Sequence, residues 1–254
     1  MGKYILKRIA LAIVTIWAVA TITFFLMNLV PGGPFLSEKA ISPAATKALE
    51  AKYGLDKPMA ERYFTYISDA AHGDFGDSLK QRGRTVMDII ATKFPVSARL
   101  GGMAVVLALC VGVPLGVLAA YKRGTFIDSL FSVIATCGIA VPGFVICTLL
   151  LYVFGVKLQW LPTLGLKSAK SYIMPVVALA AYPTSYIMRL MRSSMLDVLG
   201  QDYMRTAKAK GLSQKVSLFK HALRNAILPV ITYVGPMLAY TLTGSFVTEK
   251  IGRA

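Results

Sequence analysis

Five long stretches of this 254-residue chain contain no Asp, Glu, Lys, Arg or His. They are residues 9–30, 100–121, 129–156, 171–188 and 225–248. Because a helix needs about 20 mostly apolar residues to cross a bilayer, each stretch is a candidate membrane span. The chain is 56% hydrophobic and only 16% charged, which is too apolar for an ordinary soluble domain. The sequence therefore predicts an all-α, polytopic membrane protein.

The order of charged and apolar segments predicts a simple organisation. In chain order the segments are a cytoplasmic N-terminus (1–8), a first span (9–30), an extracytoplasmic helical segment (31–98), three further spans (99–121, 129–156 and 171–188), a cytoplasmic loop (189–224), a fifth span (225–248) and a short C-terminal end (249–254). In the external segment, Asp56 and Pro58 favour a helix that ends near Gly73. Thr85 and Asp88 form a capping-box pattern before a helix expected to end at Pro95.

The distribution of charge explains the net charge of +16. The short segments 1–8, 122–128 and 189–224 hold thirteen Lys and Arg against three Asp, whereas the long segment 31–98 is nearly neutral. Short cytoplasmic loops of membrane proteins carry such an excess of cations, and long translocated segments are exempt from the rule. The charge therefore indicates a cytoplasmic N-terminus, and it disfavours a membrane-anchored protein that binds nucleic acid or lipid. The lipid bilayer is the expected surroundings of the apolar spans, and no nucleic acid is expected as a partner.

Several classes of active protein are disfavoured by what the sequence lacks. It has no G-x-x-x-x-G-K-[ST], H-E-x-x-H or G-x-S-x-G pattern, so we expect no catalysis and no bound cofactor in this chain. Cys110, Cys137 and Cys147 have neither disulfide-framework nor metal-site spacing, so we expect packing roles and no metal. A proton-coupled secondary transporter usually needs ionisable groups at membrane depth, and the five stretches have none.

Small residues recur at every fourth position of the second predicted span. They are Ala104, Ala108, Gly112, Gly116 and Ala120. A stripe of this kind lets two helix backbones approach closely in lipid. The stripe predicts a packing face, either against a helix of the same chain or against a partner subunit.

The segment 202–230, DYMRTAKAKGLSQKVSLFKHALRNAILPV, lies between two apolar stretches and carries six cations against one acid. Gly211 divides it into two short helical candidates. In the second, Leu212, Val216, Phe219 and Leu223 share one helical face. Such a helix could lie on anionic lipid, or it could form a knob that enters a cytoplasmic partner. The glycine break favours the knob, because lying on lipid needs no break.

This segment resembles a known loop. The strings R-T-A-K-A-K-G-L (205–212) and H-A-L-R-N-A-I-L-P-V (221–230) are similar to the EAA loop of binding-protein-dependent ATP-binding cassette (ABC) importer permeases. Gly211 matches the loop's glycine and Ala207 its second alanine. Arg205 stands where the general pattern has Glu, a departure typical of the peptide/nickel branch. Further strings along the chain also resemble that branch, and they are most similar to its oligopeptide permeases. In chain order they are Y-I-L-K-R-I, P-G-G-P-F, Y-G-L-D-K-P, A-H-G-D-F-G, F-P-V-S, R-S-S-M-L-D-V-L and T-G-S-F-V.

The resemblance implies a type I ABC importer transmembrane domain, with its permease core at 96–254. It implies a multi-pass subunit of the bacterial inner membrane that moves oligopeptides delivered by an extracytoplasmic binding protein. The other implied partners are a homologous second permease subunit and two cytoplasmic ATPases, which would hold ATP and Mg. The residues implied for the contact with an ATPase are Arg205, Ala207, Lys208, Lys210, Gly211, Leu212 and His221.

Two further expectations follow from the resemblance. Members of the family usually have six spans, so the five visible here suggest a truncated C-terminal end. Dipeptide or nickel transport is the alternative within the family. Oligopeptides are preferred because the dipeptide branch tends to carry an insertion in the connection between the third and fourth spans, and this connection (157–170) is short here.

Overall fold

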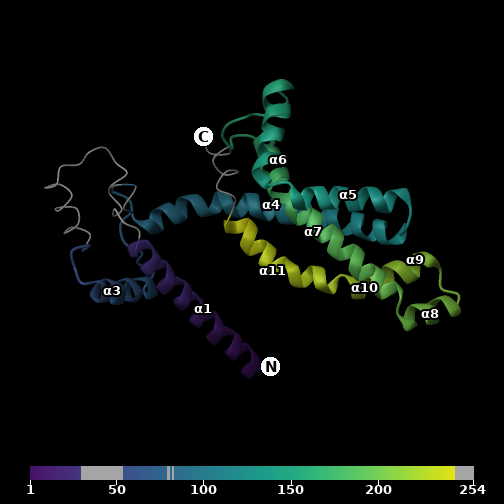
Figure 1. The fold of residues 1–254 in the computed structure, drawn as a ribbon, viewed down its shortest axis with the longest axis horizontal. Helices are drawn as coiled ribbons and strands as arrows, with labels where there is room; N and C mark the ends of the chain where they lie inside the picture. The colour runs from purple at the N-terminus through teal and green to yellow at the C-terminus, as the bar shows by residue number, and fades with distance from the viewer. Residues whose placement is uncertain (30–53, 79–80, 82, 244–254) are drawn as a thin grey trace. The chain divides into compact units, whose positions relative to one another are not determined.

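The computed structural model describes residues 1–29, 54–78, 81 and 83–243 (Figure 1). Within them every regular element is a helix, and the β-type pairing is an isolated bridge between Asp77 and Thr85. The chain divides into two compact units, Met1–Thr92 and Lys93–Ala254. The predicted all-α fold class is confirmed. Residue 30 of the first predicted span, parts of the predicted segments 31–98 and 225–248, and all of 249–254 lie outside the described residues.

The first unit begins with α1 (Gly2–Leu29), a 28-residue helix with no buried residue. At 1.5 Å per residue it is about 42 Å long, which exceeds the hydrocarbon core of about 30 Å. Its exposed side chains are mostly apolar, among them Ile9, Trp17 and Leu26. A helix that is apolar all round is stable only when lipid or another protein surrounds it.

Helix α3 (Met59–Ala71) packs on the end of α1 and lies where the sequence predicts a helix. The Arg62 guanidinium donates to the Asn28 Oδ1 atom at 2.6 Å. The rings of Phe24 and Tyr63 meet edge to face, with centroids 5.5 Å apart. Tyrosine is one of the side chains that are enriched where a span leaves the bilayer.

Helix α4 (Val86–Tyr121) starts at the predicted capping box. The Asp88 N–H donates to Thr85 Oγ1 at 3.1 Å, and the Thr85 N–H donates to Asp88 Oδ2 at 3.2 Å. The expected stop at Pro95 is wrong, because the helix continues through this proline for several more turns. A proline removes one backbone hydrogen bond, and membrane helices tolerate that loss where neighbouring groups compensate.

The predicted third span, 129–156, is not one straight helix. Helix α5 (Phe126–Ala140) is followed by α6 (Gly143–Leu150) and the π-helical η1 (Leu151–Lys157), with a bend of 102° at the break. Val141 precedes Pro142 and is extended, with φ −78° and ψ 121°. A residue before proline is disfavoured from helical geometry, and the proline lacks the N–H that would continue the ladder. The break therefore has a local cause.

Helix α7 (Ile173–Leu199) follows the short 3₁₀ turn η2 (Ala169–Tyr172) and lies at the centre of the second unit. It contacts α5, α6, α10 and α11 (Figure 1). Met188, Met191 and Met195 are among its buried side chains. The helix extends 11 residues beyond the predicted end of the fourth span at 188, so the cytoplasmic loop begins as a continuation of this helix.

The small-residue stripe of α4 packs inside the same chain. All five of its residues are buried: Ala104, Ala108, Gly112, Gly116 and Ala120. A Cβ atom on Gly116 would lie 2.6 Å from the carbonyl oxygen of Met188, and one on Gly112 would lie 2.9 Å from that of Thr184. These approaches are too close for any side chain, so α4 and α7 meet backbone to backbone there.

After α7 the chain makes a short helical excursion and then the last described span. The elements are α8 (Asp202–Ala209), α9 (Gln214–Val216), the π-helical η3 (Ser217–Ala222), α10 (Leu223–Ala226) and α11 (Leu228–Thr243). The helices on either side of Ile227 are bent by 45°. Helices α8 to α10 form one end of the second unit (Figure 1).

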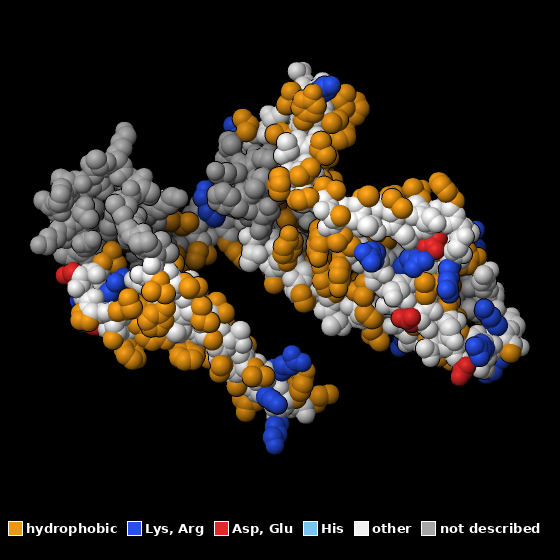
Figure 2. All heavy atoms as spheres, viewed as in Figure 1, with side chains coloured by type: hydrophobic (Ala, Val, Ile, Leu, Met, Phe, Trp, Pro, Cys, Tyr) orange, Lys and Arg blue, Asp and Glu red, His pale blue; other side chains and the backbone are white. Residues whose placement is uncertain are grey.

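The described helices accommodate three to five membrane crossings. Three of them are long and apolar enough to span a bilayer alone, and the number reaches five if each bent pair counts as one span. In the second unit, Lys and Arg side chains gather over α8, α9 and the turn before α5, whereas apolar side chains dominate elsewhere on the visible face (Figure 2). This separation is typical of a membrane protein with one cationic face.

Candidate functional site

The segment 202–226 forms a helical hairpin whose turn is built around Gly211. The Gly211 N–H donates to the Lys208 carbonyl at 2.9 Å, and the Leu212 N–H donates to the Ala207 carbonyl at 3.2 Å. These two bonds are the Schellman motif, which satisfies the last carbonyls of a helix. Gly211 has φ +75°, a left-handed conformation that side chains disfavour. The glycine therefore ends α8 and reverses the chain.

Helix α8 has one buried and one exposed face. Met204 and Ala207 are buried, at 1% and 7% exposure. Arg205, Lys208 and Lys210 are exposed. The buried face joins a core that contains Met191 and Met195 of α7 and Ala222 and Ala226 of the returning arm. The hairpin is thus anchored on its own unit and presents cations outward.

The apolar face expected on the returning arm is largely exposed in the structure. Of the four apolar residues expected together, Leu212, Val216 and Phe219 are exposed, at 39%, 41% and 60%. The buried positions are small: Ser217, Ala222 and Ala226. The π-helical turn η3 shifts the register, and the small residues allow close packing that larger ones would prevent.

A polar contact ties the two arms of the hairpin together. The Asn225 side-chain amide donates to the Tyr203 hydroxyl at 2.9 Å, which links α10 to α8. His221, implied by the resemblance at the margin of the contact, is partly exposed on η3. Both arms of the hairpin are therefore joined to each other and to the core that they share with α7.

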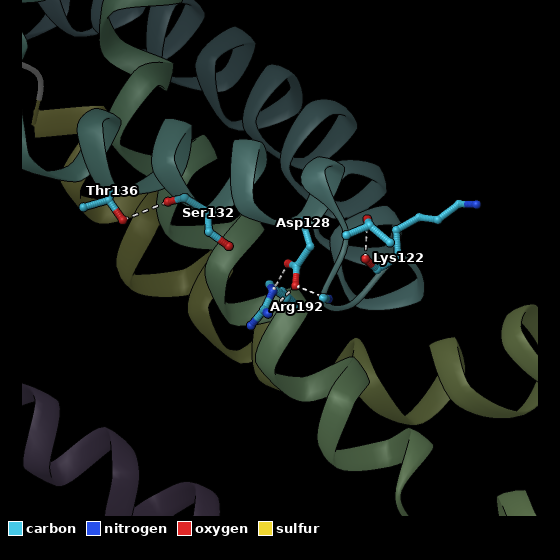
Figure 3. A network of polar contacts seen from close by, with 7 residues as sticks. Lys122, Asp128, Ser132, Thr136 and Arg192 are labelled. Atoms are coloured by element: carbon cyan, nitrogen blue, oxygen red, sulfur yellow. Dashed lines mark hydrogen bonds and ion pairs between the residues drawn. The ribbon is translucent and has the colours of Figure 1, made fainter.

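An ion pair joins the start of α5 to α7 near this hairpin (Figure 3). The Arg192 guanidinium donates to both carboxylate oxygens of Asp128, at 2.6 and 2.8 Å. Asp128 also accepts from the Gly124 N–H at 3.0 Å, so the pair includes the turn between α4 and α5. The Asp128 side chain is 8% exposed and that of Arg192 is 30% exposed. A two-bond arginine–carboxylate pair of this kind fixes both partners in orientation.

Sequence reasoning missed this ion pair. From the sequence alone, Asp128 and Arg192 are only two of the charges that indicate which segments are cytoplasmic. The two residues lie 64 positions apart, so no local sequence pattern relates them. A signal existed in the sequence: Asp128 is one of three acids among the cations of the short segments. An acid in such a position is expected to form an ion pair with a nearby cation. The sequence around Asp128 does not indicate which arginine forms that pair.

The described residues contain no group of three or more His, Cys, Asp or Glu side chains that could hold a metal ion. Cys110 and Cys137 are exposed and Cys147 is buried.

Exposed cations like those of the hairpin can pair with acidic groups of another protein. Because the hairpin leads directly into α7 and α11, displacing the hairpin would displace these helices as well.

Comparison with known proteins finds two family profiles that together match nearly the whole chain. The profile of the family described as "Binding-protein-dependent transport system inner membrane component" matches residues 112–254, and that of its N-terminal part matches residues 1–101. The oligopeptide transport system permease protein OppB of Salmonella typhimurium is 45% identical over 253 residues, covering 99% of this chain and 83% of the relative. The dipeptide transport system permease protein DppB of Bacillus subtilis is 45% identical over 251 residues, covering 99% and 82%. OppB of Escherichia coli is 43% identical, covering 99% and 83%.

Proposed function

Because the chain belongs to the family of binding-protein-dependent transport system inner membrane components, we propose that it is the permease subunit of an ATP-driven peptide importer. Relatives named for oligopeptide and for dipeptide transport share the same identity with it, which supports peptides as the substrate class. Oligopeptides are the proposed substrate only because the connection 157–170 is short, whereas the dipeptide branch tends to carry an insertion there. A proton-coupled carrier is disfavoured by the five charge-free stretches.

The loop 202–224, which makes up nearly all of the hairpin, is proposed to couple this subunit to an ATPase. The observation that carries the proposal is that α8 buries one face on its own unit and exposes Arg205 and Lys208, with Lys210 exposed at its C-terminal cap. A helix that only covered lipid would present apolar residues outward, whereas the outward residues of α8 suit an acidic groove of a protein. Movement of that protein would reach α7 and α11 through the anchored arms.

The proposed assembly follows from this role. The chain is a multi-pass membrane protein, and we place it in the bacterial inner membrane with its N-terminus and the hairpin in the cytoplasm. A homologous second permease subunit would complete the pathway, and an extracytoplasmic binding protein would deliver the peptide. Two cytoplasmic ATPases would supply ATP and Mg²⁺, so this chain itself would need no cofactor.

Co-purification from native membranes tests the proposal. Mild-detergent purification of this chain is expected to recover two ATPase chains and a second permease. The recovered complex, reconstituted with its binding protein, should hydrolyse ATP faster when peptide is added. Purification of a lone chain whose peptide uptake follows a proton gradient without ATP would contradict the proposal and favour a secondary carrier.

A further inference from the structure

A polar cleft of about 610 Å³ lies between α5 and α7. Its lining includes Ser132, Thr136, Tyr182, Tyr186, Arg189 and Arg192. Ser132 and Thr136 lie along the side of α5 that leads from Asp128 (Figure 3). Hydroxyl groups that gather in a concavity between two membrane helices are candidates for a pathway or a binding site. Both arginines lie in the part of α7 beyond the predicted fourth span and add positive charge to the cleft. The cleft therefore suits a ligand that carries negative charge and hydrogen-bonding groups.

The cleft carries one uncompensated positive charge. Arg189 and Arg192 lie one turn apart on α7, and both line the cleft. Arg192 is neutralised by its two bonds to Asp128. Arg189 is exposed and has no ion pair with any described residue. A free guanidinium in a concave site is a ready binding group for a carboxylate, to which it can donate two parallel hydrogen bonds.

A row of tyrosines continues from the cleft. The rings of Tyr182 and Tyr186 are stacked with centroids 6.4 Å apart. Tyr233 and Tyr240 of α11 extend the row, at 4.4 Å from Tyr186 and 6.2 Å from Tyr182 respectively. Tyr182, Tyr186 and Tyr240 are each more than a third exposed. A tyrosine hydroxyl can donate to or accept from a peptide backbone, and the ring packs on side chains of many kinds.

We propose that this cleft is a subsite of the peptide pathway, in which Arg189 pairs with the C-terminal carboxylate of the peptide and the tyrosine row contacts its backbone. The inference rests on the proposed function, because it assigns a binding site for the same substrate. A terminal carboxylate and a backbone are the groups that all unmodified peptides share. A subsite that recognises these groups accepts peptides as a class without selecting their sequence.

The test uses the complete complex in proteoliposomes, with the same binding protein in every arm. Initial uptake is measured against concentration for trialanine and for trialanine amide, which lacks the carboxylate. Arg189→Gln is expected to raise the half-saturating concentration of trialanine by about tenfold or more, since hydrogen bonds to charged groups are among the strong ones, and to leave that of the amide unchanged. Arg189→Lys should lie between the wild type and Arg189→Gln.

Arg123→Gln is the matched control, because Arg123 is an exposed cation of the short turn before α5 that does not line the cleft. It should change the uptake of neither peptide. An equal loss for both peptides in Arg189→Gln, or no loss for either, would overturn the inference and leave Arg189 as a cation that only sets topology. ATP-driven uptake by the wild-type complex reports separately on the proposed function, so the two can fail independently.

Discussion

Replacing Gly211 by proline is expected to reduce peptide-stimulated ATP hydrolysis by the assembled complex to its unstimulated level. Gly211 has φ +75°, and proline is locked near −65°, so the turn after α8 cannot form. Proline also removes the N–H that donates to the Lys208 carbonyl. The spans themselves are untouched, so membrane insertion and the amount of protein should match the wild type. The measurement is ATP turnover with and without peptide in reconstituted complexes.

Two further substitutions at Gly211 separate the effect of the turn from that of added bulk. A Cβ atom at this position would meet nothing within 4 Å, so side-chain size is not the constraint. Asparagine tolerates the left-handed conformation better than other residues, and Gly211→Asn should keep most of the stimulation. Gly211→Ala should lie between them, because the conformation costs alanine about 1–2 kcal/mol. Full stimulation in Gly211→Pro would show that the turn has no part in coupling.

Replacing Asp128 by asparagine is expected to destabilise the second unit by about 3 kcal/mol, because it leaves the partly buried Arg192 without its counter-ion. The change keeps the size of the side chain and removes only its charge. The turn at Gly124 should loosen as well, since its N–H loses a carboxylate acceptor. The measurement is the thermal midpoint at which the detergent-solubilised complex loses this subunit.

A double substitution controls for this prediction. Arg192→Gln combined with Asp128→Asn removes both charges, and the pair of glutamine and asparagine can still form a hydrogen bond. The double variant should recover part of the lost stability, which would show that the unpaired charge is the cause. A midpoint for Asp128→Asn that equals the wild-type value would mean that the ion pair contributes nothing to stability.

The features that could be predicted from the sequence are those with local causes. Apolar length predicted the helical membrane fold, and the Thr85–Asp88 pattern predicted the start of α4. Gly211 marked the reversal of the chain because few other residues adopt its conformation. The stripe that includes Gly116 indicated a close helix contact, although the spacing alone did not say that α7 is the partner.

Some features could not be predicted because one residue type allows two outcomes, and others because they depend on tertiary contacts. Pro95 is expected to end a helix, yet α4 passes through it, whereas the chain bends by 102° at the break beside Pro142. The buried face of the returning arm, which includes Ser217 and Ala222, lies on a π-helical turn that departs from the 3.6-residue period of an α-helix. The pairing of Asp128 with Arg192 joins residues 64 positions apart, and only the packing of α5 on α7 brings them together.

Chemical labelling at position 210 tests the coupling role of the hairpin most directly. In a variant with Cys110, Cys137 and Cys147 replaced by alanine, Lys210→Cys introduces a single thiol on the exposed turn. We expect a membrane-impermeant maleimide to leave intact cells unlabelled and to label inside-out vesicles only after the ATPases have been stripped from them. A short bifunctional reagent should cross-link this thiol to an ATPase chain in the complete complex. Labelling of intact cells from outside, with no such cross-link, would contradict both the orientation and the mechanism.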